Sequence, residues 1–457
     1  MLKIKLEKQT FGLYFIFTLI LLLLLSVFFW NGSIFVIGVL GCLLFLPFIW
    51  NLDSEMYKVL FFAMIISFAW MLLQYFGLME KFGKPYFGGD DEIFERYGDV
   101  LYKLGAYTIA DCPSFGYNID KATGFMLILA WIMRISNPFG GYHTISPRIL
   151  NIYMWLAIGV MVYKFVKKSE LLQNDKVLRK VVLGLMIFPN ALFVNSCVYR
   201  DTLSIYVLFV CVYLANELSR KNSVEKIMKI LPIFLIFVIS IYILYYVRSD
   251  LLIALAGLVV FQIFWADGTK SKFAKRILLA VLVISVGGSY TLNKVNTMLN
   301  NYNHYLLVER NAINGMSGKI FSTPIFPFGI FLRFIWGQMQ PFPGEIFTQD
   351  FYGSFLYAFI SVVVRLGTVL HICCLPYIFK SVLKLNSDAM KYLLVYMMVI
   401  VTTFGFRHFL MVYPFAAIEL YYGVKDVSRH NIRINTIFIL AACGIAGLIY
   451  VSILGIL

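Results

Sequence analysis

Residues 11–30 read FGLYFIFTLILLLLLSVFFW and contain no charged side chain. An apolar run of about 20 residues is long enough for a helix to cross a lipid bilayer. It is too long for the apolar core of a cleavable signal peptide, which has roughly 7–15 residues. This stretch therefore predicts a membrane-spanning helix near the start of the chain.

The composition of the whole chain agrees with this start. Of its 457 residues, 61% are hydrophobic and 14% are charged. Soluble domains have roughly 45–50% apolar and about 25% charged residues. This excess excludes a soluble enzyme, a secreted disulfide scaffold and a disordered regulator. The net charge of +15 fits basic cytoplasmic loops rather than a nucleic-acid partner. We expect an all-α polytopic membrane protein that forms a single integral membrane domain over residues 1–457.

Further apolar runs follow the first one. Together they predict about thirteen transmembrane helices. The predicted spans are 12–30, 33–50, 57–77, 147–166, 180–198, 202–217, 230–247, 250–266, 277–292, 354–379, 389–405, 409–424 and 434–455.

Two shorter apolar segments, 124–138 and 324–336, are interrupted by Arg134 and Arg333. Lysine and arginine collect in the cytoplasmic loops of membrane proteins, which decides between the alternatives. If both segments are interfacial helices and the N-terminus is cytoplasmic, 24 of the 39 basic residues fall inside. We therefore expect a protein of the cytoplasmic (inner) membrane with its N-terminus inside and its C-terminus outside.

This topology creates two large outer loops, 78–146 and 293–353. The first carries eight of the 24 acidic residues of the chain. The predicted inner loops are short and basic, so we expect the chemistry on the outer side.

The first outer loop contains an acidic turn, Gly88-Gly89-Asp90-Asp91-Glu92. Such a sequence is typical of a helix start, where an aspartate caps the helix and acids lie near the positive end of its dipole. At the mouth of a membrane protein, the same carboxylates also suit a general base or a divalent cation that neutralises a phosphate. Both interpretations stay open at this point.

Two predicted outer turns pair arginine with aspartate, Tyr199-Arg200-Asp201 and Arg248-Ser249-Asp250. Each aspartate can cap the helix that follows it. Two such turns within a few spans also suit an anionic ligand. A third outer turn holds Arg407 and His408. The guanidinium of Arg407 can bind a lipid phosphate in a bidentate manner or anchor the helix at the interface.

Taken in chain order, these features resemble the GT-C superfamily of membrane glycosyltransferases, such as protein O-mannosyltransferases and the aminoarabinose transferase of lipid A. The resemblance depends on the order of four short motifs. They are Asp90-Asp91-Glu92 followed by the interfacial segment 124–138, Pro147-Arg148-Ile149-Leu150-Asn151, Asp201, and Arg407 followed by Pro414. The chain departs from the better-known members because two spans precede the one that leads into the acidic loop, and because it has no appended outer domain.

The resemblance implies a GT-C-like fold and a sugar donor linked to polyprenyl phosphate. It assigns the catalytic base to Asp90 or Asp91, a supporting role to Asp201, and the donor phosphate to Arg407. Further candidates are Arg200, Arg248 and His408 for the phosphate and Glu92 as a supporting acid. No cofactor is certain; a divalent cation, Mg²⁺ or Mn²⁺, is a candidate, with Asp91 and Asp201 as its ligands.

The expected function is transfer of a sugar to a glycan, lipid or protein acceptor on the outer face of the membrane. The absence of a Gly-x-Gly-x-x-Gly or Walker sequence agrees with a lipid-linked rather than a nucleotide-linked donor. One alternative is a polysaccharide polymerase or ligase that acts on a lipid-linked oligosaccharide. Another is a lipid-linked glycan flippase or transporter, which should line its spans with polar residues. The polar candidates within predicted spans are Arg365, His371 and Glu419.

Overall fold

The computed structural model describes residues 2–116, 120, 122–170, 175–220, 227–264, 320, 323, 329–343, 354–402 and 406–453. All regular elements in these residues are helices, and the described residues contain no strand. The chain forms two compact units, which are described separately. The first contains residues 1–207, 246–249 and 351–360, and the second contains the remaining residues.

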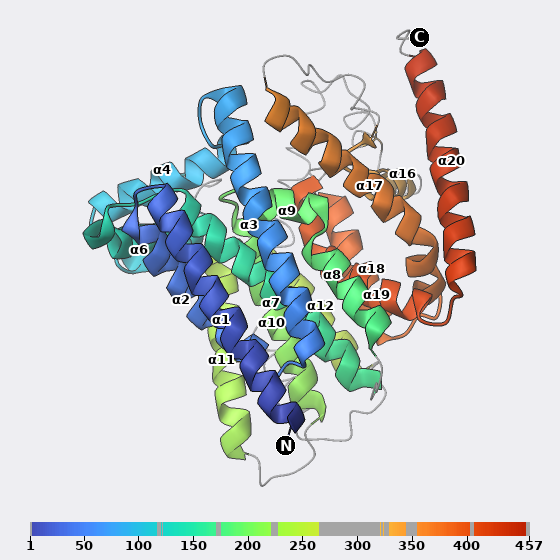
Figure 1. The fold of residues 1–457 in the computed structure, drawn as a ribbon, viewed down its shortest axis with the longest axis horizontal. Coiled ribbons are helices and arrows are strands. Elements are labelled where there is room, and N and C mark those ends of the chain that lie inside the picture. Colours follow the sequence, from blue (N-terminus) through green and yellow to red (C-terminus); the bar gives the residue numbers. More distant parts are fainter. Residues whose placement is uncertain are drawn as a thin grey trace. The chain divides into compact units, whose positions relative to one another are not determined.

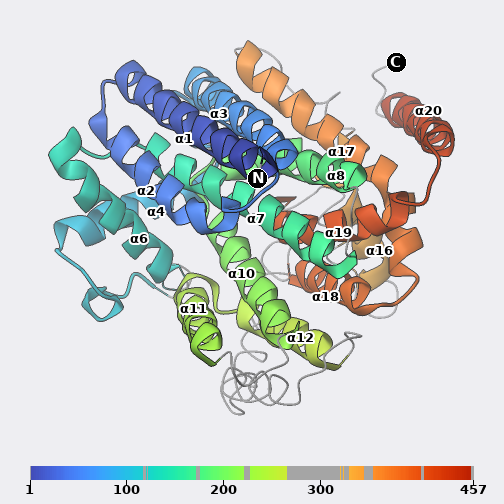
Figure 2. The same cartoon turned by 60° about the horizontal axis from the view of Figure 1, so that its bottom comes forward.

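The first unit is built around long apolar helices (Figures 1 and 2). Its elements are α1 (Leu2–Phe28), α2 (Gly32–Ile49), α3 (Ser54–Phe82), α4 (Gly89–Lys103), η1 (Ile109–Asp111), α6 (Thr123–Ser136), η2 (Asn137–Phe139), α7 (Ile145–Glu170), α8 (Lys176–Met186) and α9 (Pro189–Asn195). Helix α10 (Arg200–Arg220) begins in this unit, as its residues up to 207 belong to it.

Among the described residues, five helices are long and apolar enough to cross a membrane: α1, α2, α3, α7 and α17 (Phe355–Val382). The bent pair α8 and α9 passes the same test together and raises this number to six. The prediction of an all-α chain with several apolar helices that could span a membrane is thus confirmed. The predicted span 277–292 and most of the loop 293–353 lie outside the described residues.

The span predicted over 180–198 contains a bend that its sequence did not predict. Helices α8 and α9 meet there at an angle of 47°, and Pro189 opens α9. Proline cannot donate the backbone hydrogen bond that would continue α8, and it favours an extended residue before it. Phe188 accordingly has extended backbone angles, φ −61° and ψ 122°.

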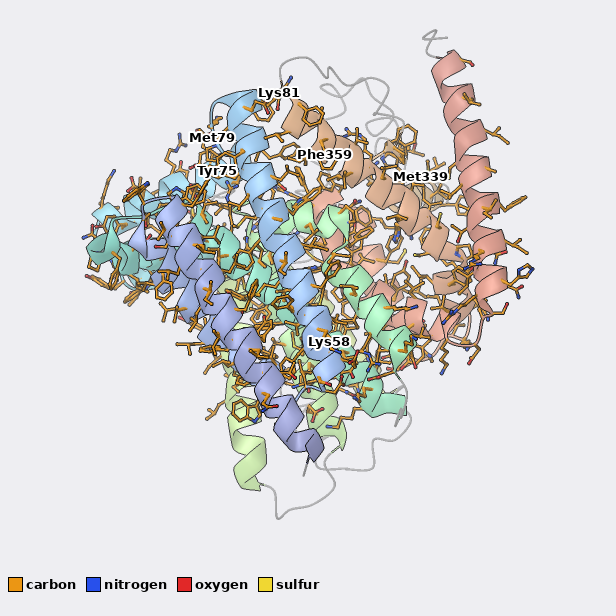
Figure 3. The ribbon with its side chains drawn as sticks, in the orientation of Figure 1. Lys58, Tyr75, Met79, Lys81, Met339 and Phe359 are labelled. Carbon is orange, nitrogen blue, oxygen red and sulfur yellow. The ribbon has the colours of Figure 1, made fainter. Side chains whose placement is uncertain are left out.

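The long helices of the first unit run between two opposite ends of that unit. At one end, the Asn31 amide between α1 and α2 donates to the carbonyls of Gly140 and Gly141, before α7. At the other end, Asp53 before α3 contacts Lys167 near the end of α7. The stretch between α3 and α7 therefore leaves and returns at the same end, as the predicted interfacial position of 124–138 requires. Figure 3 shows the length of α3, with Lys58 near one end and Lys81 near the other.

Helices α4 and α6 pack against each other within that stretch. Gly98 allows close approach, because a Cβ atom there would lie 2.9 Å from the Cβ of Leu129. The rings of Phe94 and Phe125 meet edge to face at 5.4 Å. The positions of Phe94 and Gly98 on α4 thus pack against α6.

The second unit is also helical. Its elements are the rest of α10, most of α11 (Ile227–Arg248) and α17, and α12 (Leu251–Phe264), α16 (Ile330–Gln338), α18 (Ser387–Thr402), η6 (Phe406–Met411), α19 (Tyr413–Val424) and α20 (Arg429–Ile453). Helix α18 contacts α12, α16, α19 and η6. Its buried Lys391 donates to Gln262 of α12 at 2.5 Å and to Asp388 at 2.9 Å. The span predicted over 409–424 is divided here into η6 and α19.

Candidate functional site

The acidic turn forms the start of α4, as its sequence predicts. Gly88 precedes the helix in an extended conformation. The carboxylate of Asp91 accepts hydrogen bonds from the backbone N–H groups of Phe87, Gly88 and Glu92 at 3.1–3.2 Å. The side chain of Asp91 is fully buried, and this burial raises its pKa against the opposing effect of the three hydrogen bonds. Asp91 is therefore held as a helix cap.

The neighbouring acids are more accessible than Asp91. Asp90 is half-buried in the first turn of α4. Glu92 forms an ion pair with Lys84, and both side chains are close to half exposed. Of the two predicted bases, Asp90 is thus the more exposed one.

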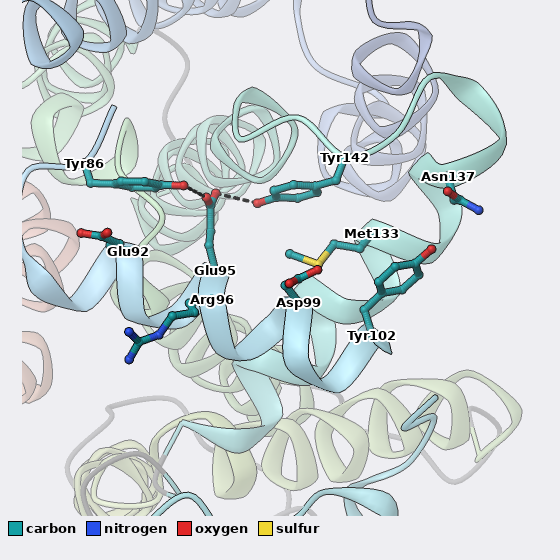
Figure 4. A pocket seen from close by; sticks show the side chains of 9 residues that line it. All are labelled: Tyr86, Glu92, Glu95, Arg96, Asp99, Tyr102, Met133, Asn137 and Tyr142. Carbon is teal, nitrogen blue, oxygen red and sulfur yellow. Dashed lines mark hydrogen bonds between the residues drawn. The ribbon is translucent and has the colours of Figure 1, made fainter. Parts of the chain in front are cut away.

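Glu95 lies one turn further along α4 and is 5% exposed. Its carboxylate accepts hydrogen bonds from the hydroxyls of Tyr142 at 2.6 Å and Thr144 at 2.5 Å, and from Tyr86. Figure 4 shows Glu95 between the two tyrosines. Burial and the charge of Glu95 raise the pKa of both tyrosines, so these hydroxyls stay protonated as donors.

Glu95 is part of the lining of a pocket of about 390 Å³. This volume lies within the roughly 300–1,000 Å³ of small-molecule sites. Residues of α4, α6 and the flanking loops line it: Tyr86, Glu92, Glu95, Arg96, Asp99, Tyr102, Met133, Asn137 and Tyr142 (Figure 4). The four charged residues follow the i, i+3, i+4, i+7 spacing of one helix face.

Arg148 enters the same region from the first turn of α7. Its side chain is fully buried and donates from Nη2 to the carbonyl of Pro85. Its guanidinium carbon lies 5.7 Å from the centre of the Tyr75 ring. Within the described part of the chain, its Nε and Nη1 atoms have no hydrogen-bond partner. A buried guanidinium with unused donors is costly unless something else binds to it.

The charge of Arg148 acts on several neighbours. It lowers the pKa of Asp91, although burial raises this pKa by more. It also opposes the rise in the pKa of Tyr86 and Tyr142. Burial, and secondly Arg148, lower the pKa of His143 to about 4. His143 is therefore neutral at physiological pH, and its Nδ1 accepts from the N–H of Ile145 at 3.2 Å.

The predicted turn at Arg200 and Asp201 belongs to the same unit. Asp201 and Arg248 are buried and form an ion pair. Arg200 donates to the carbonyl of Val247 at 3.2 Å. Two of the arginines predicted to bind phosphate thus have protein partners in this structure.

This turn lies against the loop that leads into α4. The rings of Phe87 and Phe193 meet edge to face at 4.7 Å. The guanidinium of Arg200 lies 5.9 Å from the centre of the Phe94 ring. The structure thus brings together three of the four motifs: the acidic turn, the entry to α7 and the Arg200–Asp201 turn.

The fourth motif belongs to the second unit. Arg407 and His408 lie in η6, and both are half-buried.

A metal site at Asp91 and Asp201 has little support from the geometry. Asp91 is held by backbone N–H groups and Asp201 by Arg248. Among the described residues, no three His, Cys, Asp or Glu side chains are grouped so that they could hold a metal ion.

A second cavity of about 290 Å³ lies among α2, α6, α7 and α10. Its lining is almost wholly apolar and includes Leu44, Phe125, Leu150 and Leu203, with Asn151 as a polar member. Asn151 donates to the carbonyl of Cys197 at 2.9 Å. This groove begins within one helical turn of Arg148 on α7 and suits a hydrocarbon chain.

Sequence reasoning did not select Glu95, Arg148, Tyr86 and Tyr142 as site residues. A signal for Glu95 was present, because Glu92, Glu95, Arg96 and Asp99 have the spacing of one helix face. Arg148 was noted as part of a motif, but its burial beside α4 cannot be read from the sequence.

Comparison with known proteins gives no relative: no family model, no curated protein and no solved structure matches this chain. The chemistry of the site is therefore the basis for a functional proposal.

Proposed function

We propose that this protein is a membrane glycosyltransferase of the GT-C type that moves a sugar from a polyprenyl-phosphate donor to an acceptor on the outer face. The observation that carries the proposal is the meeting of the acidic turn of α4 with Arg148 and the Arg200–Asp201 turn. These segments are distant in sequence and gather at one end of the first unit.

The reaction needs few groups from the protein. A sugar on a polyprenyl phosphate brings its own leaving group, so the enzyme must take a proton from an acceptor hydroxyl and stabilise the departing phosphate. We assign the base to Asp90, because the carboxylate of Asp91 is occupied as a helix cap. Glu92 and Asp201 are supporting acids. The apolar groove along α7 supports a hydrocarbon carrier.

The donor phosphate requires cationic groups. Arg200 lies near Phe94 of α4, and Arg248 pairs with Asp201 of the same turn; these two arginines are the candidates of the first unit. The role of Arg407 and His408 on the donor phosphate stays a prediction, which an Arg407→Ala variant tests. A divalent cation, Mg²⁺ or Mn²⁺, stays a candidate for neutralising the donor phosphate.

The protein in lipid nanodiscs tests the proposal directly. The donors are prenyl-phosphate monosaccharides with a labelled sugar, and the acceptors come from host membranes that lack this protein. The wild-type protein should transfer the label to glycan and release free prenyl phosphate. Asp90→Asn should lower transfer by about 10²–10⁴-fold, the usual contribution of a general base. The matched control is Glu55→Gln, an exposed acid at the opposite end of α3, which should transfer at the wild-type rate.

Two results would contradict the proposal. Asp90→Asn could transfer as well as the control, which would remove the base. Alternatively, the wild-type protein could translocate a lipid-linked glycan without releasing prenyl phosphate, which would identify a flippase. A lipid-linked oligosaccharide, offered as a second donor, separates a polymerase or ligase from a monosaccharide transferase.

The proposal includes about thirteen spans, with the loop 78–146 outside and the N-terminus inside. Cys112 offers a test because its free thiol is partly exposed in this loop. A membrane-impermeant maleimide should label intact cells at Cys112, and Cys112→Ser should lose this label. Burial and the charge of Asp111 raise the pKa of the thiol, so the reaction is run at mildly alkaline pH. Labelling of Cys112 only after lysis would place the acidic loop in the cytosol and end the enzyme proposal.

A further inference from the structure

Apart from the supporting acid Glu92, the residues that line the pocket along α4 have no role in the reaction described so far. The base Asp90 is not among its lining residues, whereas Glu92, Glu95 and Asp99 are. A cavity of about 390 Å³ with aromatic and polar walls has the size and composition of a ligand site.

The hydrogen-bonding groups of the pocket are mostly acceptors. Its lining contains three carboxylates and the amide of Asn137, with Arg96 as its one cationic member. The hydroxyls of Tyr86 and Tyr142 donate to Glu95, which leaves their oxygen atoms able to accept. A ligand that fits must therefore bring several donors. A phosphate group brings almost none, so the donor's phosphate does not match this lining.

The carboxylates of the pocket already have partners. Glu92 pairs with Lys84, and Asp99 pairs with Lys103 at 2.6 Å. Glu95 accepts from three hydroxyls. Two of the three carboxylates are thus paired with lysines and the third is bound by hydroxyl groups, so the lining offers acceptor lone pairs that suit the hydroxyls of a ligand.

Arg148 adds the complementary donors beside this pocket. Its charge acts on the hydroxyls of Tyr86 and Tyr142, which form the pocket wall around Glu95. Its Nε and Nη1 atoms are buried and have no hydrogen-bond partner among the described residues. Arg148 is not among the lining residues of the pocket, so it affects a ligand there through its charge on the two tyrosines.

The walls also have apolar faces. Tyr86, Tyr102 and Tyr142 present rings to the pocket, and Met133 adds a flexible apolar side chain (Figure 4). Aromatic rings of this kind bury the C–H face of a sugar while their polar ends bind its hydroxyls.

We propose that the pocket lined by Glu95, Tyr86 and Tyr142 binds a neutral saccharide, and that this saccharide is the acceptor of the transfer reaction. The acceptor role rests on the proposed function. Binding of a saccharide in this pocket does not, because it can be measured without sugar transfer. It selects a glycan over a lipid or a protein as the acceptor class.

Binding is measured on the full-length protein in nanodiscs by saturation-transfer NMR. The probes are neutral gluco-, manno-, galacto- and N-acetylglucosamine trisaccharides at millimolar concentration. At least one should bind the wild-type protein. Glu95→Gln should weaken that binding about tenfold and Tyr142→Phe several-fold, because each removes part of the hydrogen-bonded wall.

The matched control is Tyr107→Phe. Tyr107 lies outside the pocket and is 56% exposed. It should bind the trisaccharide as the wild type does. Thermal unfolding of each variant shows whether it is folded, and Tyr142→Phe keeps the test valid if Glu95→Gln does not fold.

Several outcomes would overturn the proposal. They are no binding of any trisaccharide, equal binding by all variants, or displacement of the trisaccharide by spermidine or by geranyl phosphate. Displacement by spermidine would identify a cation site, and displacement by geranyl phosphate a donor site. Trisaccharide binding without any sugar transfer would leave the saccharide site in place and reject the proposed function, so the two failures are distinct.

Discussion

The two ends of α7 carry charged clusters that differ in how their hydrogen bonds are used. The Lys167 cluster consists of Asp53, Tyr163, Lys167, Asp175 and Arg179. Lys167 contacts Asp53 at 3.1 Å and Asp175 at 3.2 Å. Arg179 also pairs with Asp175, and the Tyr163 hydroxyl bonds to both carboxylates. Two acids and two bases thus satisfy one another.

The Arg148 cluster, at the other end, consists of Asp91, Glu95, Tyr142, His143 and Arg148. Its acids are satisfied by N–H groups and hydroxyls rather than by the arginine. Arg148 keeps two nitrogen atoms without a hydrogen-bond partner among the described residues. The same helix therefore ends in a closed ion network on one side and in an incomplete polar cluster on the other.

The comparison suggests different roles for similar residues. A closed network contributes to stability, and removing one member leaves a charge without its partner. An incomplete buried cluster costs stability and is typical of a site that a ligand completes. Substitutions at the two ends should therefore separate activity from stability.

The largest effect is expected from Arg148→Met. The substitution removes the unpaired donors; if these donors stabilise charge at the reacting centre, transfer should fall by at least about 100-fold. The thermal midpoint should stay closer to the wild-type value than that of a Lys167-cluster variant, because a partly unsatisfied buried charge is removed. Sugar transfer and thermal unfolding in the same nanodiscs measure both quantities. Wild-type transfer with a strongly lowered midpoint would make Arg148 a structural residue.

The next effect is expected from Asp175→Asn in the Lys167 cluster. Asp175 is 5% exposed and bonds to three members of the cluster. Hydrogen bonds to charged groups contribute about 1.5–3 kcal/mol each, so we expect unfolding free energy to fall by about 2–3 kcal/mol. Transfer by the folded fraction should be unchanged.

Denaturant titration in detergent micelles measures this loss, and Lys58→Ala is its control. Lys58 pairs with Glu55 at the same end of the unit, but the two side chains are 69% and 54% exposed. Such exposed pairs contribute at most about 1 kcal/mol. Equal losses for Asp175→Asn and Lys58→Ala would show that the closed network has no special stabilising role.

The sequence predicted much of the fold because hydrophobicity alone places helices in lipid. The apolar runs at α1, α2, α3, α7 and α17 need no tertiary information. The bend at Pro189 was missed, since a proline within an apolar run is compatible with a kinked or an unbroken span. Helix α4 was predicted from its glycines and acids, because capping is a local interaction between residues a few positions apart.

The candidate site was less accessible to sequence reasoning. The acidic turn and Asp201 were found because their residue types stand out in an apolar chain. Their partners were not, since Glu95 and Tyr142 are 47 residues apart, as are Asp201 and Arg248. Arg148 meets the carbonyl of Pro85 across 63 residues. Contacts over such distances depend on how helices pack, which a single sequence does not specify.

The smallest effect concerns pH and again separates the two clusters. Burial lowers the pKa of His143 to about 4, from its ordinary value of 6.5. The unfolded chain therefore binds this proton more readily than the folded protein between about pH 4 and 6.5. The stabilising contribution of neutral His143 is full above pH 6.5 and is lost as the pH falls through this window. In the Lys167 cluster, the pKa of Asp53 is lowered from 3.8. The contribution of Asp53 to stability is therefore lost only at a pH below the window of His143.

His143→Asn tests this difference because its side-chain oxygen can still accept from the N–H of Ile145, while it cannot be protonated. The thermal midpoint of the wild type should fall between pH 7 and pH 4.5, and that of His143→Asn should fall less. The raised pKa of Asp91 opposes this trend in both proteins, so the difference between the two curves isolates His143. Parallel curves would mean that protonation of His143 does not destabilise the Arg148 cluster. A flatter variant curve would instead show that charging the buried imidazole of His143 beside Arg148 destabilises this cluster, as the lowered pKa of His143 indicates.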